Sequence, residues 1–198
     1  QPCSSAASDV YKRQDIDLLE EFNEGLICLS GCLKGELPEK MLKGDFEGAK
    51  KIAIMYSQIF NDRYYLEIQN HGIPEEEANI ANMKKLSSEL GLPLVCTNDA
   101  HYARQNHWEA HDIHICLGTG KERSDQNRLR YATPEFYFKS EDQMFKLFKE
   151  FPGAIENSRK IADSINLELP IGESHLPKFP IPESALTSDP NKYLQALT

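Results

Sequence analysis

The sequence predicts an α/β fold built on a parallel sheet. Three observations predict it: short apolar runs typical of buried strands, longer segments with helical periodicity, and at least three alternations of the two along the chain. The expected strands span residues 25–31, 64–69 and 92–97. Strands that alternate with helices in this way pair in parallel, either in an open sheet or in a barrel.

The expected helices lie between these strands and after them. Residues 45–60 place apolar side chains at helical spacing, with Lys and Glu on the opposite face. Pro74 opens a second helix with three glutamates in its first turn, where the helix dipole favours negative charge, and Gly91 ends it. The remaining expected elements are helices at 15–22, 107–118, 140–150 and 152–166, and a short strand at 136–140.

Composition and charge favour a globular protein over other classes. The chain has 198 residues, 40% of them hydrophobic, and 31 acidic against 22 basic side chains give a net charge of −9. This balance argues against a broad basic surface for nucleic acid, so we expect the chain by itself not to bind DNA tightly. The loop at 121–134 carries a weak basic patch. No run approaches the roughly 18 apolar residues of a membrane span, so we expect a cytoplasmic protein without membrane contact.

Three segments divide the chain. Residues 1–14 have no apolar periodicity and look like a translated sequencing adapter, so we expect a cloning scar outside the native fold. Residues 15–166 carry the alternating strands and helices. Prolines recur after Leu167, and we expect 167–198 to be an extended connector with a further helix beginning near Leu194.

Residues with metal-binding side chains follow two of the expected strands. Cys32 follows the first strand, and Asp99 and His101 follow the third. Because the carboxyl ends of parallel strands meet at one edge of a sheet, we expect these side chains to gather there. Carboxylate and imidazole ligands suit zinc, manganese or iron, and a thiolate favours zinc. The alternative is an Asp–His pair whose hydrogen bond simply ends the strand.

Other residues near the strand ends are weaker candidates. Glu67 lies within the second strand and is placed to orient a metal ligand through a hydrogen bond. His71 follows that strand in a turn, and a solvated side chain is the alternative there. His107, His111 and His114 recur at helical spacing, but we expect them to serve packing, because no carboxylate completes a recognised motif.

Five segments, in this order, resemble the alpha-subunit family of bacterial DNA polymerase III: EGLICLSGCLKGEL, DRYYLEIQNHGIPEE, ELGLPLVCTNDAHY, EAHDIHICLGTGK and HLPKFPIPE. The resemblance runs from Asp15 to about Glu183. It implies that 15–166 are the second half of the N-terminal PHP (polymerase and histidinol phosphatase) domain, part of a distorted (β/α)7 barrel. It also implies that 167–198 lead toward the polymerase core.

The resemblance also implies a function. Cys32, Asp99 and His101 match the cysteine, aspartate and histidine metal ligands of family members that keep the full set. The implied protein is a DNA-directed DNA polymerase, a nucleotidyltransferase, with a metal-dependent 3′–5′ exonuclease in its PHP domain. Zinc or manganese would occupy the PHP site and magnesium the polymerase core, which lies outside this chain. DNA and the other replicase subunits are the implied partners.

Two alternatives accompany this interpretation. In one, the PHP domain is a non-catalytic scaffold that supports the polymerase core and docks accessory subunits. In the other, it is a stand-alone PHP phosphoesterase that acts on a small phosphate monoester, against which the proline-rich segment HLPKFPIPE argues. Under the polymerase interpretation we expect the chain alone to be inactive, because several ligands would lie upstream of Asp15.

Overall fold

The computed structural model describes residues 16–169, 171–172, 180–182, 185 and 187–197. They belong to two compact units, Gln1–Ser164 and Ile165–Thr198. The expected scar at 1–14 and most of the segment HLPKFPIPE lie outside the described residues.

A parallel sheet organises the first unit. Its strands are β1 (Cys28–Leu29), β2 (Tyr64–Ile68) and β3 (Leu94–Cys96), in the order β1-β2-β3. Cys28 pairs with Tyr64, and Leu66 pairs with Leu94. The predicted α/β class with a parallel sheet is thereby confirmed, with strands shorter than expected.

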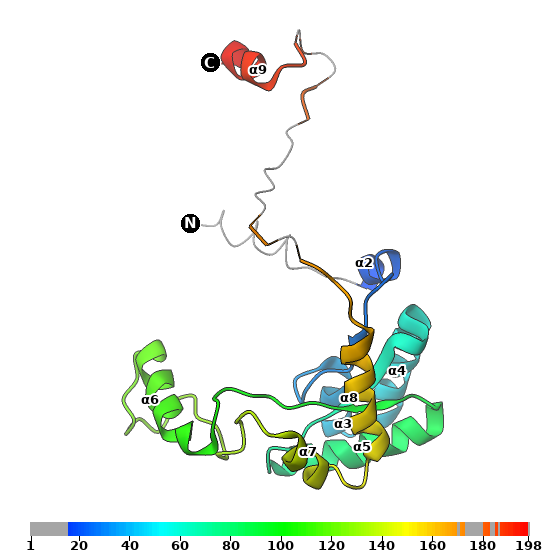
Figure 1. The fold of residues 1–198 in the computed structure, drawn as a ribbon, viewed down its shortest axis with the longest axis vertical. Coiled ribbons are helices and arrows are strands. Elements are labelled where there is room, and N and C mark those ends of the chain that lie inside the picture. The colour runs from blue at the N-terminus through cyan, green and yellow to red at the C-terminus, as the bar shows by residue number, and fades with distance from the viewer. Residues whose placement is uncertain (1–15, 170, 173–179, 183–184, 186, 198) are drawn as a thin grey trace. The chain divides into compact units, whose positions relative to one another are not determined.

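Several helices of this unit lie against the sheet, whereas α6 (Trp108–Thr119) lies apart from it (Figure 1). The described helices of the unit are α2 (Ile16–Glu21), α3 (Glu36–Leu42), α4 (Phe46–Phe60), α5 (Pro74–Leu90), α6 (Trp108–Thr119), α7 (Glu141–Leu147) and α8 (Pro152–Ser164), with 3-10 turns η1 (Asn61–Arg63) and η2 (Gln105–His107). Helix α5 packs against β2 and β3, α8 packs against β3, and α3 contacts α4 and α5. Strands β2 and β3 are therefore covered by helices.

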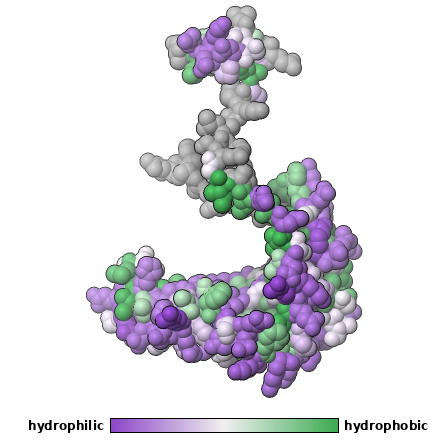
Figure 2. All heavy atoms as spheres, viewed as in Figure 1, coloured by the Kyte–Doolittle hydropathy of each residue, from purple (hydrophilic) through white to green (hydrophobic). Residues whose placement is uncertain are grey.

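The core lies where these helices meet β2. Leu66 and Ile68 of β2 are fully buried, as are Ala53 of α4 and Met83 and Leu86 of α5. The buried positions of α4 and α5 recur at helical spacing, which is the pattern that predicted these helices. Hydrophilic residues dominate the face of this unit seen in Figure 2, with smaller apolar patches between them.

Helix boundaries follow the local signals in the sequence. The Asp45 side chain accepts a hydrogen bond of 2.9 Å from the Gly48 amide and caps α4. Gly91 ends α5 with a φ of 68°, a left-handed conformation that glycine adopts without steric cost. Ser140 and Gln143 form both hydrogen bonds of the predicted capping box at α7.

Two local expectations were wrong, and one helix was not expected. Residues 136–140 form no strand, because only one isolated bridge, between Tyr102 and Tyr137, pairs this segment. Helix α7 ends at Leu147 rather than at about Glu150. Helix α3 was not predicted, since it is short and contains Pro38; proline is tolerated in the first turn of a helix, where its missing amide has no intrahelical acceptor.

The second unit contains α9 (Pro190–Leu197). The Asp189 carboxylate accepts a hydrogen bond of 2.9 Å from the Asn191 amide at the start of this helix. Among the described residues, no helix has both the length and the apolar character needed to cross a membrane.

Candidate metal centre at the strand ends

Glu67 ties the carboxyl ends of all three strands together. Its carboxylate accepts a hydrogen bond of 3.2 Å from the Gly31 amide after β1 and another from the Thr97 hydroxyl after β3. Its own backbone amide donates to the Ser30 hydroxyl at 2.8 Å. Gln69 donates to Glu67 and Thr97 at 3.1 and 2.9 Å and completes the network. The segments that follow the three strands therefore meet around one carboxylate.

Cys32 lies in the turn beside this network. It directly follows Gly31, whose φ of 82° turns the chain after β1 and whose amide is bound to Glu67. The Cys32 carbonyl accepts a 2.7 Å hydrogen bond from the Gly35 amide, and Cys32 is exposed as a free cysteine. The cysteine is thus at the edge of the sheet where it was expected, and its thiol is accessible to solvent.

Asp99 and His101 form a close pair past the end of β3. Asp99 Oδ1 lies 3.1 Å from His101 Nε2, and the two side chains are 46% and 34% exposed. The Tyr131 hydroxyl lies 3.0 Å from the same imidazole nitrogen. This distance is consistent with the expectation that the two side chains gather at the ends of the strands. Both groups are open to a ligand from solvent.

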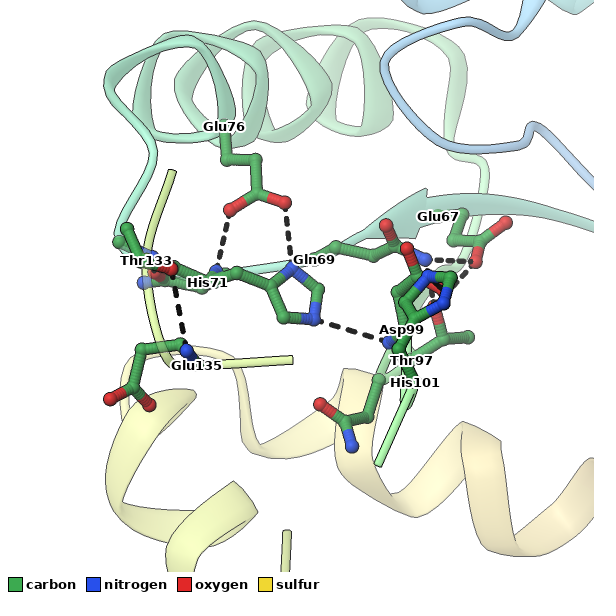
Figure 3. A network of polar contacts seen from close by, with 12 residues as sticks. Glu67, Gln69, His71, Glu76, Thr97, Asp99, His101, Thr133 and Glu135 are labelled. Atoms are coloured by element: carbon green, nitrogen blue, oxygen red, sulfur yellow. Dashed lines mark hydrogen bonds and ion pairs between the residues drawn. The ribbon is translucent and has the colours of Figure 1, made fainter. Parts of the chain in front are cut away.

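His71 is buried, so the alternative of a solvated side chain was wrong. It is 1% exposed and donates from Nδ1 to Glu76 Oε1 at 2.7 Å, while its backbone amide donates to Glu76 Oε2 at 2.5 Å. Its Nε2 accepts a 3.1 Å hydrogen bond from the Asp99 amide. Figure 3 shows the imidazole between the Glu76 carboxylate on α5 and the Asp99 backbone. A buried chain of hydrogen bonds thus runs from α5 to the candidate ligand.

The charge of Glu76 depends on this chain of hydrogen bonds. Burial by itself raises the pKa of the Glu76 carboxyl, but the hydrogen bonds from the His71 side chain and amide outweigh it, and the pKa is lowered. A backbone amide can only donate, so the Nε2 that accepts from Asp99 carries no proton and Nδ1 carries one. The network therefore fixes the tautomer of His71 and holds the backbone of Asp99.

Aromatic rings join the buried and the exposed histidine. Phe136 stacks on His71 with ring centroids 4.4 Å apart and planes 5° apart, and its centroid lies 6.0 Å from that of His101. Tyr131 contacts both His101 and Phe136, each with centroids 4.6 Å apart. The His101 imidazole is therefore bounded by rings on the protein side and open on the other.

The three histidines in and just before α6 divide into two groups. His107 and His114 are exposed, while His111 is partly buried with its ring centroid 5.7 Å from that of His101. Burial lowers the pKa of His111, and charge on His101 and His114 lowers it further. No pattern in the sequence indicates that His111 adjoins the strand ends, because this contact depends on the path of the segment between β3 and α6.

The donor set suits a divalent metal in part. Asp99 and His101 supply an oxygen and a nitrogen side by side, which is a combination that zinc and manganese accept. Within the described part of the chain, no group of three or more His, Cys, Asp or Glu side chains is close enough to hold a metal ion. Two of the three predicted ligands are therefore brought together, and Cys32 lies on the same edge without completing a cluster.

Comparison with known proteins gives the class of the fold. Residues 3–71 match the PHP domain, so this part of the chain is similar to proteins of that class. The match begins inside the stretch 1–14, and the origin of that stretch in a cloning adapter stays a prediction.

Curated relatives then extend the match to nearly the whole chain. It is 44% identical over 174 residues to DNA polymerase III subunit alpha of Treponema pallidum, a match that covers 87% of this chain and 15% of the relative. It is 40% identical over 187 residues to the same subunit of Borreliella burgdorferi, covering 94% of this chain and 16% of the relative. The predicted resemblance to the PHP region of DNA polymerase III subunit alpha is thereby confirmed. The chain spans about 15% of the length of the curated relatives it matches.

Proposed function

We propose that the chain is part of the PHP domain of a replicative DNA polymerase, and that Asp99, His101 and Cys32 belong to a metal centre that hydrolyses phosphodiester bonds at a 3′ end. The observation that carries the proposal is the solvent-exposed pair of Asp99 and His101, whose side chains lie 3.1 Å apart. The buried His71 supports this pair, because its Nε2 accepts a hydrogen bond from the Asp99 backbone amide. A side-chain pair that only ended a strand would not require such support. The sequence similarity to DNA polymerase III subunit alpha supports the same function.

Each residue has a distinct part in this proposal. Asp99, His101 and Cys32 would hold the ion, and a bound divalent ion lowers the pKa of a water ligand and neutralises charge on phosphate. His71 fixes the Asp99 backbone through the hydrogen bond to its amide. Glu67 fixes the Gly31 amide and hence the turn that carries Cys32. Such supporting contacts orient ligands and strengthen metal binding.

We propose that the chain is one part of a longer polymerase. Residues 15–166 would be the second half of a distorted (β/α)7 PHP barrel, and 167–198 the connector toward a magnesium-dependent polymerase core. Its nucleotidyltransferase activity would act on DNA together with other replicase subunits, in the cytoplasm. The first-half ligands of the barrel would complete the metal centre, so we expect no nuclease turnover from the 198-residue chain alone. Turnover that His101→Ala abolishes would contradict this expectation.

Metal analysis of the full-length protein tests the metal centre. We expect purified wild-type protein to contain zinc or manganese, and Cys32→Ser and His101→Ala to lose it while the protein stays folded by circular dichroism. His107→Ala is the matched control, because His107 is an exposed histidine at the start of α6. Equal metal content in all four proteins, or a metal-free wild type with normal polymerase activity, would contradict the proposal.

One observation favours the scaffold as a second candidate. The described residues contain no three-ligand cluster, as expected for a PHP domain that has lost its metal. A metal-free wild type with normal polymerase activity is the outcome that the scaffold predicts, so the same experiment separates the two functions.

A further inference from the structure

A pocket with three arginines lies beside the candidate metal centre, between α6 and the loop that follows it. It has a volume of about 260 Å³, and the residues that line it include Tyr102, Trp108, Arg123, Arg128, Arg130 and Tyr131. We call it the arginine pocket. Tyr131 belongs both to this pocket and to the surroundings of His101. The pocket and the Asp99–His101 pair are therefore adjacent.

One of the three arginines is structural. Arg128 donates from Nη1 and Nη2 to the two carboxylate oxygens of Asp112 at 2.5 and 2.7 Å, and its side chain is 4% exposed. The hydrogen bonds from Arg128 lower the pKa of the Asp112 carboxyl, so this group is ionised at neutral pH. The bidentate pair fastens the loop to α6 and leaves little charge on Arg128 to bind anything else.

The other two guanidinium groups are available. Arg123 lies 3.6 Å from both Glu109 and Asp112, which is beyond the length of a good hydrogen bond, and its side chain is 54% exposed. Arg130 donates to the Asp125 carbonyl at 2.9 Å and, within the described part of the chain, has no carboxylate within 4.0 Å. Two cations with unused donors thus border the pocket of an acidic protein, which suits an anionic ligand.

An aromatic surface accompanies these cations. Trp108 is 41% exposed, although tryptophan is usually highly buried, and it lines the pocket together with Tyr102 and Tyr131. Arginines beside exposed aromatic rings are the combination with which proteins hold single-stranded nucleic acid, the guanidinium on phosphate and the ring under a base. The pocket volume of about 260 Å³ is slightly smaller than that of most small-molecule sites, which begin at roughly 300 Å³. The pocket is therefore large enough for about one nucleotide unit and not for a longer stretch of strand.

We propose that the arginine pocket binds one nucleotide unit of a single DNA strand, with the phosphate on Arg123 and Arg130 and the base on Trp108. This inference rests on the proposed function, since it supplies the strand on which a neighbouring metal centre acts. It extends that function by assigning strand binding to residues outside the metal ligands. The acidic chain keeps the affinity low, and we expect a dissociation constant on the order of 10⁻⁵ M, within the range of nonspecific binding.

Trp108 provides the measurement, because it is the only tryptophan in the chain. An oligothymidylate of about eight nucleotides is titrated into the 198-residue chain in EDTA, and tryptophan fluorescence is followed. We expect saturable quenching from a base stacked on the indole. Arg123→Ala and Arg130→Ala should each weaken binding about fivefold or more and lower the salt slope by about 0.7, the value for one lost single-strand phosphate contact. Arg130→Glu should weaken it further.

Arg159→Ala is the matched control, since Arg159 is 81% exposed on α8 and pairs only with the exposed Asp163 among the described residues. Its affinity should equal that of the wild type. Inorganic phosphate, which has no base, should compete weakly and leave the fluorescence unchanged. Wild-type affinity in both arginine variants, with circular dichroism showing the wild-type fold, would overturn the proposal, as would the absence of quenching at millimolar oligonucleotide.

The two proposals fail in different ways. Because EDTA removes metal, oligonucleotide binding does not depend on the metal centre. In one outcome, Cys32→Ser and His101→Ala leave the metal content unchanged while the arginine variants lose oligonucleotide affinity. This outcome contradicts the proposed metal centre and supports the proposed role of the arginine pocket. The opposite pattern overturns the arginine pocket and leaves the metal centre.

Discussion

His71 and His101 both follow a strand of the same sheet and both contact a carboxylate, but their surroundings are opposite. His71 is 1% exposed and uses both ring nitrogens in hydrogen bonds within the protein. The side chain of His101 is 34% exposed, and its polar neighbours are Asp99 and the hydroxyl of Tyr131, which lies near the surface. The role of a histidine in this protein is therefore not defined by its position after a strand. The buried histidine supports the backbone, whereas the exposed one can take a ligand.

The largest expected effect is on folding stability. His71→Ala removes the side-chain donor to the buried Glu76 carboxylate and leaves a cavity where the imidazole stacks on Phe136, so we expect it to lower the free energy of unfolding by about 3–5 kcal/mol. His101→Ala, which removes one member of an exposed pair, should lower it by less than about 1 kcal/mol. Urea unfolding of the two variants measures both values. Equal losses would remove the distinction between the two histidines.

A smaller effect is expected from Glu76→Gln, and it depends on pH. The folded protein lowers the pKa of Glu76 below its usual value of 4.5, so the carboxylate stabilises the fold above that pH. This contribution is lost as the pH falls through the lowered pKa. We expect the variant to lose about 1–3 kcal/mol at neutral pH, because a buried hydrogen bond is weakened.

The same variant should lose less stability relative to the wild type as the solution is acidified. Urea unfolding of both proteins between pH 7 and pH 3 measures the difference and cancels the contribution of the other carboxylates. A difference that stays constant over this range would show that the charge of Glu76 does not contribute.

The smallest effects compare two hydroxyl groups. The Thr133 hydroxyl donates to the His71 carbonyl, and the Tyr131 hydroxyl lies 3.0 Å from His101 Nε2. Thr133→Val should cost about 1 kcal/mol, because it leaves a largely buried carbonyl without that donor. Tyr131→Phe should cost less than about 0.5 kcal/mol, as for most changes near the surface. The reverse order in urea unfolding would contradict the assignment of a supporting role to the His71 region.

Much of the fold was predictable from local signals. Helices α4 and α5 carry apolar residues at helical spacing, and their ends carry Asp45 and Gly91, so pattern and boundary agree. Helix α3 was missed because its seven residues are too few for a periodic pattern and contain Pro38. The strand order could not be read from the sequence, but the alternation of strands and helices was sufficient to predict parallel pairing.

The site was predictable only where its residues are close in sequence. Asp99 and His101 are two residues apart after a strand, and their contact follows from that spacing. The burial of His71 was not predictable, because Asp99, which donates to its ring, lies 28 residues away along the chain. Glu76 five residues later, in the first turn of a helix opened by proline, was the one local signal of its partner. Contacts of this kind depend on how the segments return to the sheet.

Cobalt binding to the full-length protein tests most directly whether Cys32, Asp99 and His101 form one metal centre. Cobalt(II) replaces zinc at such sites, and a bound thiolate gives a charge-transfer absorption that imidazole and carboxylate ligands lack. Cys28→Ser is the matched control, because burial raises the pKa of the Cys28 thiol to about 11 and keeps it protonated. With saturating cobalt, we predict the thiolate absorption in wild type and Cys28→Ser, its absence in Cys32→Ser and its loss in His101→Ala. No thiolate absorption in the wild type, or the same absorption in Cys32→Ser, would contradict a shared metal centre.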